Sequence, residues 1–398
     1  MPDSTPVYGI SRQSGPWEWM YHGTAFAAYD RMNGPRGDRD LTGPNWAMAM
    51  GRRRIGSDSE LQLRGMVSLD PVTVGGGGYP LLLQTGESWR GQPLMDHQHP
   101  HNYVSELAAQ YRRATGPSSV ASLYLGVVGE PALGPPAFMH RTLALDDPLA
   151  PIGHHWQDST HIAYGVVTLG YATRTWQIEL STFNGREPGE NRSRIESPEF
   201  DSASARLSHN PSPEWALQVS HGYLRRPEAL HPEADIHRTT ASAIFNRRLD
   251  ERRNWQSAFV WGRNRVAGHD YDSFLLEASR KRDGGWSPYV RLEQVSKSSE
   301  ELVLPSGFTA SKGHLVRQFT LGAVRDLPIG GGYQWGVGGQ VILSTVPDAL
   351  EPVYGHNPTG WLVFVRVHPR QMEHRQQAPT ARPEEREADG HGAHGSHP

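Results

Sequence analysis

Hydrophobic and polar residues alternate with a period of two along most of this chain, which is the pattern of β-strands with one apolar face. From Tyr333 to Ser344, alternate positions read Tyr, Trp, Val, Gly, Val and Leu, and the positions between them read Gln, Gly, Gly, Gln, Ile and Ser. The same split recurs in 61–69, 176–181 and 215–222. Charged residues fall on the polar face, where a water-filled or plugged lumen could solvate them: Arg64, Glu179, Glu277, Arg291 and Glu293.

This pattern predicts about 16 strands, an even number as in single-chain bacterial barrels. The predicted strands are 17–29, 45–53, 60–69, 104–113, 120–128, 161–171, 176–183, 201–207, 215–224, 237–247, 255–263, 271–280, 286–295, 315–325, 333–344 and 360–367.

Every second connection between these strands is a tight polar turn, and the connections between are long. The tight turns are 54–58, 115–118, 172–175, 210–213, 249–252, 283–285 and 327–332. The long connections are 32–44, 70–103, 129–160, 184–199, 225–235, 297–313 and 346–359. This layout predicts an all-β fold, an antiparallel transmembrane β-barrel with short turns at one rim and loops at the other.

The two rims of such a barrel face different compartments. Short turns of outer-membrane barrels face the periplasm, so the chain ends would lie there and the long loops would be extracellular or fold back into the lumen. A barrel of about 16 strands has a lumen wide enough for water and solutes unless something fills it. The two longest loops, 70–103 and 129–160, are therefore the expected plug.

Five tight turns are followed at once by a tryptophan that starts the next strand. Indole buries its ring in lipid while its N–H stays near water, so a Trp that recurs at one height predicts a membrane-interface girdle. The five residues are Trp176, Trp215, Trp255, Trp286 and Trp335.

Composition fits this interpretation and excludes other classes. Apolar residues make up 36% of the chain and the mean hydropathy is −0.59, so no stretch approaches the roughly 20 apolar residues of a spanning helix. The net charge of −3 gives no reason to expect a nucleic-acid partner. The chain lacks cysteine, and its 43 glycines and 31 prolines suit turns and curved strands. No signal peptide is visible at the start, so a soluble β-rich binding protein remains an alternative.

One loop carries a histidine-rich segment, Leu94-Met95-Asp96-His97-Gln98-His99-Pro100-His101-Asn102, preceded by Tyr79-Pro80-Leu81-Leu82-Leu83-Gln84-Thr85-Gly86. From about residue 17 to 368 the chain resembles Gram-negative outer-membrane β-barrel proteins. Within that class it is similar to a group that carries a D-x-Q-H-P-H-like segment and is associated with copper and heavy-metal handling. The resemblance implies an outer-membrane location and a role with such metals.

The residues themselves also favour metal binding. Histidine is a good ligand for copper and zinc, and an H-x-H-x-H run places alternate imidazoles on one side of an extended backbone. If both long loops enter the lumen, their ligands could share one copper or zinc site. The candidates are Asp96, His97, His99, His101, His140, His154 and His155, with Met139, Asp158 and His161 nearby. The alternative is that these histidines only hydrogen-bond the loop to the barrel wall.

Three regions are expected: an N-terminal extension (1–16), the barrel (17–368) and a charged tail (369–398). The tail lacks apolar periodicity and predicts a disordered segment whose His391, His394 and His397 could hold metal ions weakly.

The favoured function is a porin-like channel or transport protein rather than an enzyme. Its expected partners are outer-membrane lipid and small solutes or metal ions, and oligomers such as porin trimers would be compatible with it. No phosphate-binding or nucleophile-elbow motif occurs. An outer-membrane lipid hydrolase is the alternative, with Ser273 beside His269 and Asp270, or Ser220 beside His221.

Overall fold

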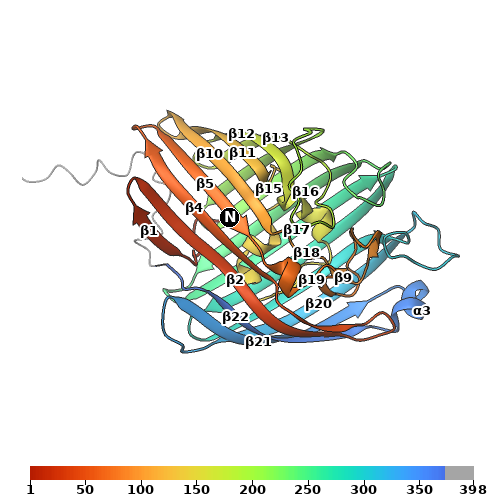
Figure 1. Cartoon of the computed structure of the whole chain (residues 1–398). Helices are drawn as coiled ribbons and strands as arrows, with labels where there is room; N and C mark the ends of the chain where they lie inside the picture. The colour runs from red at the N-terminus through yellow and green to blue at the C-terminus, as the bar shows by residue number, and fades with distance from the viewer. Residues whose placement is uncertain (373–398) are drawn as a thin grey trace, which may run out of the picture.

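A single antiparallel sheet closes on itself into a barrel in the computed structural model, which describes residues 1–372 (Figure 1). Sixteen long strands form the wall, and each pairs with the next along the chain. The wall closes where the first strand pairs with the last, with Ala25 opposite Val367. The wall strands are β2 (Trp17–Met32), β4 (Asn45–Ile55), β5 (Ser59–Val67), β10 (Val104–Gly116), β11 (Ser119–Gly129), β12 (Ala163–Ala172), β13 (Trp176–Phe183), β14 (Ser202–Ser212), β15 (Trp215–Leu224), β16 (Ile236–Arg248), β17 (Arg253–Val266), β18 (His269–Arg282), β19 (Trp286–Ser298), β20 (Gly313–Asp326), β21 (Tyr333–Thr345) and β22 (Thr359–Pro369).

Two short strands complete the 18-stranded sheet. β1 (Ile10–Ser14) pairs with residues 17–21 of β2, beyond the point where β22 ends its pairing. β3 (Arg39–Thr42) pairs with residues 28–31 of β2, beyond the reach of β4. The predicted N-terminal extension is therefore partly a strand of the wall, while residues 373–398 of the predicted tail lie outside the described residues.

All sixteen predicted strands are present, which confirms the predicted fold class. Several extend further than the apolar alternation, because the backbone ladder continues into polar residues near the rims. β14, for example, continues to Ser212. One predicted start is wrong: His161 belongs to the 3₁₀ helix η3 (Ser159–His161), and β12 begins at Ala163.

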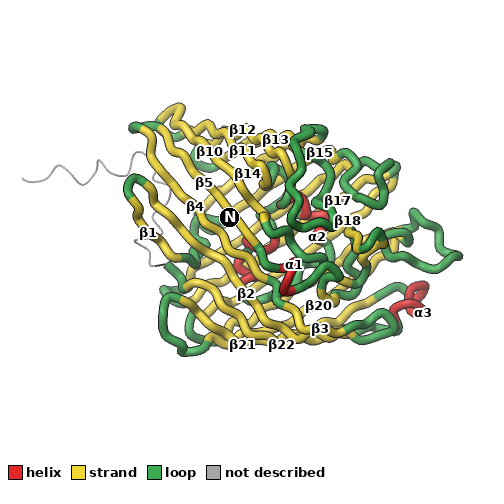
Figure 2. Tube along the Cα trace, in the orientation of Figure 1, coloured by secondary structure: helices red, strands yellow, loops and turns green. Residues whose placement is uncertain are grey.

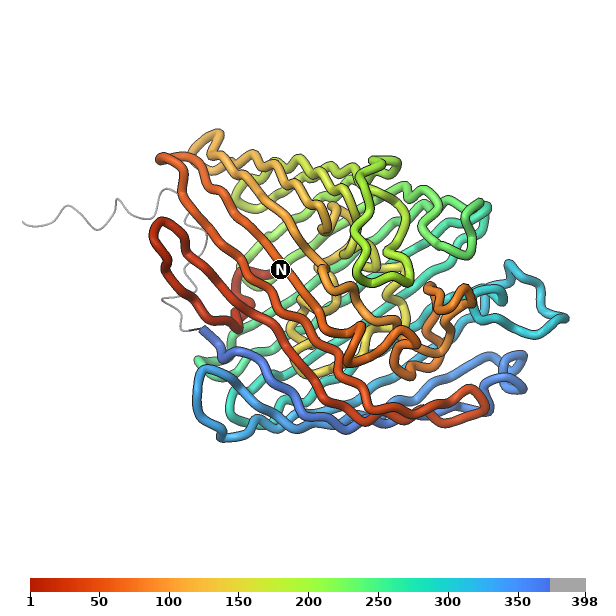
Figure 3. The backbone as a smooth tube through the Cα atoms, viewed as in Figure 1, coloured from red at the N-terminus to blue at the C-terminus, as the bar shows by residue number. Residues whose placement is uncertain are grey.

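The seven tight turns gather at one rim, called the short-turn rim, and the long loops gather at the other (Figure 3). β2 starts and β22 ends at the short-turn rim, as predicted. The long loops carry short elements (Figure 2). These are α1 (Asp70–Thr73), β6 (Tyr79–Pro80), β7 (Glu87–Trp89), β8 (Gln92–Leu94), β9 (His97–Gln98), η1 (Phe138–His140), η2 (Thr142–Leu145), α2 (His154–Gln157), η4 (Asp348–Leu350) and α3 (Glu351–Tyr354).

The wall is apolar outside and polar inside, the reverse of a soluble sandwich. Leu180 is 55% exposed on the outer face, whereas Arg291 on the inner face is 2% exposed. Leucine, valine, isoleucine and phenylalanine side chains cover the outside of most wall strands. This distribution does not favour the soluble alternative, because a water-facing surface would not expose so much contiguous apolar area. Among residues 1–372, no helix is long and apolar enough to cross a bilayer.

The loop from Glu130 to Ile162, called the plug, lies inside the barrel. Ion pairs attach it to the inner wall: Arg141 to Glu277 at 2.7 Å, and Lys281 to Asp146 at 2.8 Å. Its backbone N–H groups also donate to the wall, as Ala132 does to Ser181 Oγ at 2.8 Å. The predicted folding of this loop into the lumen is therefore what the structure shows.

The second long loop, 70–103, packs on the plug at the long-loop side. Leu81, Leu82 and Leu83 are at most 1% exposed and share one apolar cluster with Trp156 of the plug. The Ala150 N–H of the plug donates to Tyr79 Oη at 2.9 Å. The two loops thus form one packed body inside the wall.

Candidate functional site

Two elements of the 70–103 loop, β9 and α1, place His99 and His101 toward the plug. β9 pairs with β6, with His97 opposite Pro80, and the chain then leaves this small sheet. α1 fixes Asp70 beneath the segment, where its Oδ2 lies 2.7 Å from His101 Nδ1 and accepts the His101 backbone N–H at 3.2 Å. His99 and His101 are both buried, and their ring centroids lie 6.3 Å apart.

The plug supplies three further histidines from two short consecutive helices. α2 begins at His154 and ends at Gln157, so His154 and His155 are adjacent, and η3 then ends at His161. Asp158, between the two helices, holds two of the rings: its Oδ1 lies 2.5 Å from His154 Nδ1, and its backbone oxygen lies 2.8 Å from His161 Nδ1.

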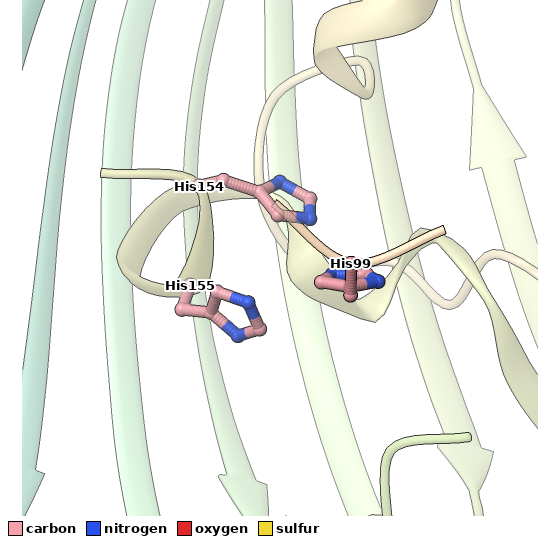
Figure 4. A group of neighbouring side chains, drawn as sticks. All are labelled: His99, His154 and His155. Atoms are coloured by element: carbon pink, nitrogen blue, oxygen red, sulfur yellow. The ribbon is translucent and has the colours of Figure 1, made fainter. Parts of the chain in front are cut away.

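These five histidines form one buried cluster, called the histidine cluster: His99, His101, His154, His155 and His161. The ring centroid of His154 lies 5.1 Å from that of His155 and 5.2 Å from that of His161. The potential ligand nitrogens of His99, His154 and His155 all lie within 4.8 Å of one another (Figure 4). Two nitrogens on a tetrahedral zinc at about 2.0–2.1 Å are roughly 3.3 Å apart, so modest ring rotations would bring these three into range.

The five rings share one pattern of contacts at Nδ1. Nδ1 of each faces an oxygen: Asp70 for His101, Asp158 for His154 and His161, Pro100 O at 3.2 Å for His99, and Glu187 Oε2 at 3.4 Å for His155. The opposite nitrogen, Nε2, is buried without a hydrogen-bond partner in four of them: His99, His101, His155 and His161. Metal-bound histidines are held in this way, with the second ring nitrogen donating to a carboxylate or carbonyl.

Burial keeps the imidazoles of His99 and His161 in the neutral form that can bind a metal. It lowers the pKa of His99 well below the ordinary value, and the nearby positive charge of Arg192 adds to the effect. Burial, followed by the neighbouring rings of His154 and His101, lowers the pKa of His161 to about 3. A neutral ring offers a lone pair on its unprotonated nitrogen, so both remain ligands at neutral pH.

Carboxylates surround the cluster. Glu87 Oε1 lies 3.5 Å from His99 Nε2, and Glu187 lies beside His155. Four of the histidines, Glu87 and Glu187 line a small cavity of about 10 Å³, roughly the space of one water molecule. An ion in this position would meet imidazole and carboxylate ligands together, a set that suits zinc or Cu(II).

Gly86 allows this packing. Its φ is +111°, and an added Cβ would lie 2.6 Å from His155 Cγ. The close approach of the 70–103 loop to the plug therefore requires glycine at this position.

The structure does not bring Asp96 or His97 to the cluster, contrary to prediction. Asp96 has φ of +57°, so the backbone turns just before His97. Its carboxylate instead accepts the Leu83 N–H at 2.7 Å and pairs with Arg36 at 3.4 Å. His97 points outward, with Nε2 3.4 Å from Asp38 and its side chain 24% exposed.

His140 is also separate from the cluster. It follows Met139 in η1, and its ring lies against Trp46 and His22, with centroids 5.0 Å and 6.2 Å away. The cluster instead includes His161, which sequence reasoning placed in a strand, together with Glu87 and Glu187 as neighbours. The H-W-Q-D-S-T-H spacing from His155 to His161 is a signal that could have indicated it, because it fits two consecutive helical turns.

The five predicted girdle tryptophans are all exposed, by 38% to 58%. Trp176, Trp215 and Trp286 begin their strands at the short-turn rim, and Trp255 and Trp335 are the third residues of β17 and β21. Their role at a membrane interface stays a prediction.

The two serine–histidine pairs considered for a hydrolase do not meet. Ser273 faces the lumen and accepts a hydrogen bond from Gln157 at 2.8 Å, whereas His269 is exposed. Ser220 is bonded to the plug and to Thr240, and His221 points to the other face of β15. Neither serine therefore has the base that nucleophilic catalysis requires.

No protein-family model and no curated protein matches the sequence. Solved structures do match. OmpF of Salmonella typhi, solved in complex with daunomycin, has a TM-score of 0.56 at 10% identity over 90% of this chain and 100% of its own. The anion-selective porin from Comamonas acidovorans has a TM-score of 0.52 at 12% identity over 88% of this chain and 99% of its own.

The fold is that of a porin. At identities this low the likeness concerns the fold alone, and it agrees with the closed wall of sixteen strands. Within this porin fold, the histidine cluster is a feature of the chain's own loops.

Proposed function

We propose that this chain is an outer-membrane barrel of porin fold that binds a copper or zinc ion at the histidine cluster inside its plugged lumen, and that it transports or sequesters that ion. The observation that carries the proposal is the shared contact pattern of the rings. Four buried Nε2 atoms lack partners, while the Nδ1 atoms face oxygens. Leaving buried polar atoms unpaired is unfavourable, and an ion bound to the Nε2 atoms of His99 and His155 would satisfy two of them.

The outer surface supports the membrane location. An apolar belt of exposed leucine, valine and phenylalanine surrounds the wall, and exposed tryptophans lie toward the short-turn rim. A bilayer would cover the belt, and the tryptophans would lie at its interface. With the porin fold, this points to the outer membrane of a Gram-negative bacterium.

The test is metal titration of the folded, full-length protein in detergent. In isothermal titration calorimetry with Zn²⁺ or Cu²⁺, the triple variant His99→Ala, His154→Ala, His155→Ala should lose the tight binding component, a loss of more than about tenfold in affinity. Weak binding by the tail histidines should remain.

The matched control is His97→Ala, which removes a histidine of the same loop that points away from the cluster. It should leave the tight component unchanged. Heat-modifiable migration on a denaturing gel would verify that each variant forms the barrel. Tight binding that persists in the folded triple variant would refute the proposal.

A further inference from the structure

We propose a second metal site of different chemistry: a soft-donor site for Cu(I), formed by His22, Met48 and Met66 of the wall with Met139 and His140 of the plug. This inference goes beyond the proposed function and does not depend on it, because none of these residues belongs to the histidine cluster.

Strand register puts the wall residues in one row. His22 of β2 is opposite Met48 of β4, and Met48 is opposite Met66 of β5. Side chains directly opposite each other on neighbouring antiparallel strands have Cβ atoms about 4.5–5.5 Å apart. Met48 and Met66 are inward and buried, at 4% and 3% exposure. An imidazole and two thioethers therefore lie side by side on the inner wall.

The plug covers this row with the same two residue types. Met139 belongs to one buried cluster with Trp46, Met48 and Met66. His140 follows it, and its ring lies 6.2 Å from that of His22. Of the nine methionines in the chain, three meet here, and Met50 packs against them.

One observation points to a ligand rather than to packing alone. His22 Nε2 is buried without a hydrogen-bond partner, which an apolar surrounding does not explain. The nearest charges are also already matched: Arg64 lies 3.1 Å from Glu106, which accepts the Tyr124 hydroxyl at 2.7 Å.

The donor set selects the ion. Thioether sulfur is a soft ligand that favours Cu(I) over zinc, magnesium or calcium. All five proposed side chains are neutral donors when the imidazoles are unprotonated. A monovalent ion leaves less uncompensated charge in this buried position than a divalent one.

Phe138 lies between the two sites. Its ring is 5.2 Å from His154 of the histidine cluster, and it belongs to the same apolar cluster as Met48 and Met66. Copper is the one metal that suits both donor sets, Cu(II) at the imidazoles and Cu(I) at the thioethers.

The test measures Cu(I) held by the folded, full-length protein under anaerobic reducing conditions, in competition with the chromophoric chelator bicinchoninate. It is run in the background of the triple variant His99→Ala, His154→Ala, His155→Ala, which removes the first site. X-ray absorption should show copper–sulfur scattering. The change Met48→Leu with Met66→Leu keeps the volume nearly constant. It should weaken that scattering to what Met139 alone contributes and lower Cu(I) affinity by more than about tenfold.

Met32→Leu is the matched control, since Met32 is a buried methionine of β2 in a different cluster. It should change neither measurement. The inference is overturned if Cu(I) binds without sulfur scattering, or if Met48→Leu with Met66→Leu leaves binding unchanged. If the triple variant without the methionine changes no longer binds Cu(I), the ion belongs to the histidine cluster. The proposed function then stands without the second site.

Discussion

Gly86 shows how a residue that binds nothing can shape the histidine cluster. Its backbone, at φ of +111°, lies against the ring of His155. Because glycine has no side chain, nothing displaces that ring. Metal affinity depends on ring placement within a few tenths of an ångström, so a residue behind a ligand can matter nearly as much as the ligand.

We therefore predict that Gly86→Ala lowers zinc affinity of the cluster by about tenfold, because the new methyl group displaces the His155 ring. Calorimetric titration of the folded variant measures this. Gly91→Ala is the control: Gly91 also has positive φ, +71°, but open space surrounds its Cβ position. Equal affinity losses in the two variants would show that backbone strain, not displacement of His155, is responsible.

At this scale the sequence predicted four of the five histidines in the cluster, His99, His101, His154 and His155. It grouped Asp96 and His97 with them because an alternating run predicts an extended backbone, and His140 because both loops were expected to share one site. The left-handed backbone at Asp96 breaks that assumption, and a single non-glycine residue at positive φ is not visible in a residue pattern. The sequence placed His161 near the candidates but at the start of a strand, because its helix is short and adjoins β12.

The plug is the element whose attachment can be perturbed most directly. His161 is packed against His101, His154 and Phe138, with the Asp158 backbone oxygen at its Nδ1. In a released loop its pKa would be about 6.5, whereas in the docked plug burial lowers the pKa to about 3. Below pH 6.5 the released form therefore binds a proton that the docked form does not, and docking weakens as pH falls toward 3.

We predict that the plug becomes more accessible to protease between pH 7 and pH 5, by a free-energy change on the order of 2 kcal/mol from this group. Cleavage within residues 130–162 of reconstituted protein, followed by mass spectrometry, measures it. His161→Asn should flatten this pH dependence. A dependence just as steep in His161→Asn would assign the effect to other groups.

The strands were predictable for a physical reason that the plug does not share. A wall between lipid and a polar lumen imposes a period of two on every strand, and that period is visible in one sequence. Nothing comparable constrains a loop folded against the inner wall. Its length indicated a plug, but the partners of Arg141, Lys281 and Arg291 depend on tertiary placement.

For the whole molecule, the structure predicts a barrel that conducts little until the plug is removed. Buried ion pairs hold the plug across the lumen, with Arg291 3.0 Å from Asp147 and Arg366 3.1 Å from Asp146. Removing one partner of such a pair leaves a buried charge, which costs about 3–5 kcal/mol.

We predict that replacing residues 131–160 by a short Gly-Ser linker gives large ion currents in planar bilayers, because a wall of sixteen strands encloses a water-wide lumen. Refolded wild-type protein is the control and should conduct far less under the same voltage. A wild-type conductance equal to that of the shortened variant would mean that ions already pass around the plug.

The short strand β1 affects whether barrels of this chain can pair edge to edge. Where β22 stops pairing, residues 17–21 of β2 would present unpaired N–H and C=O groups, and such an edge can recruit a strand from another molecule. β1 covers this stretch. It replaces the exposed edge of a long strand with that of five residues, Ile-Ser-Arg-Gln-Ser, which are short and mostly polar. The N-terminal residues therefore protect the seam of the barrel against edge-to-edge aggregation.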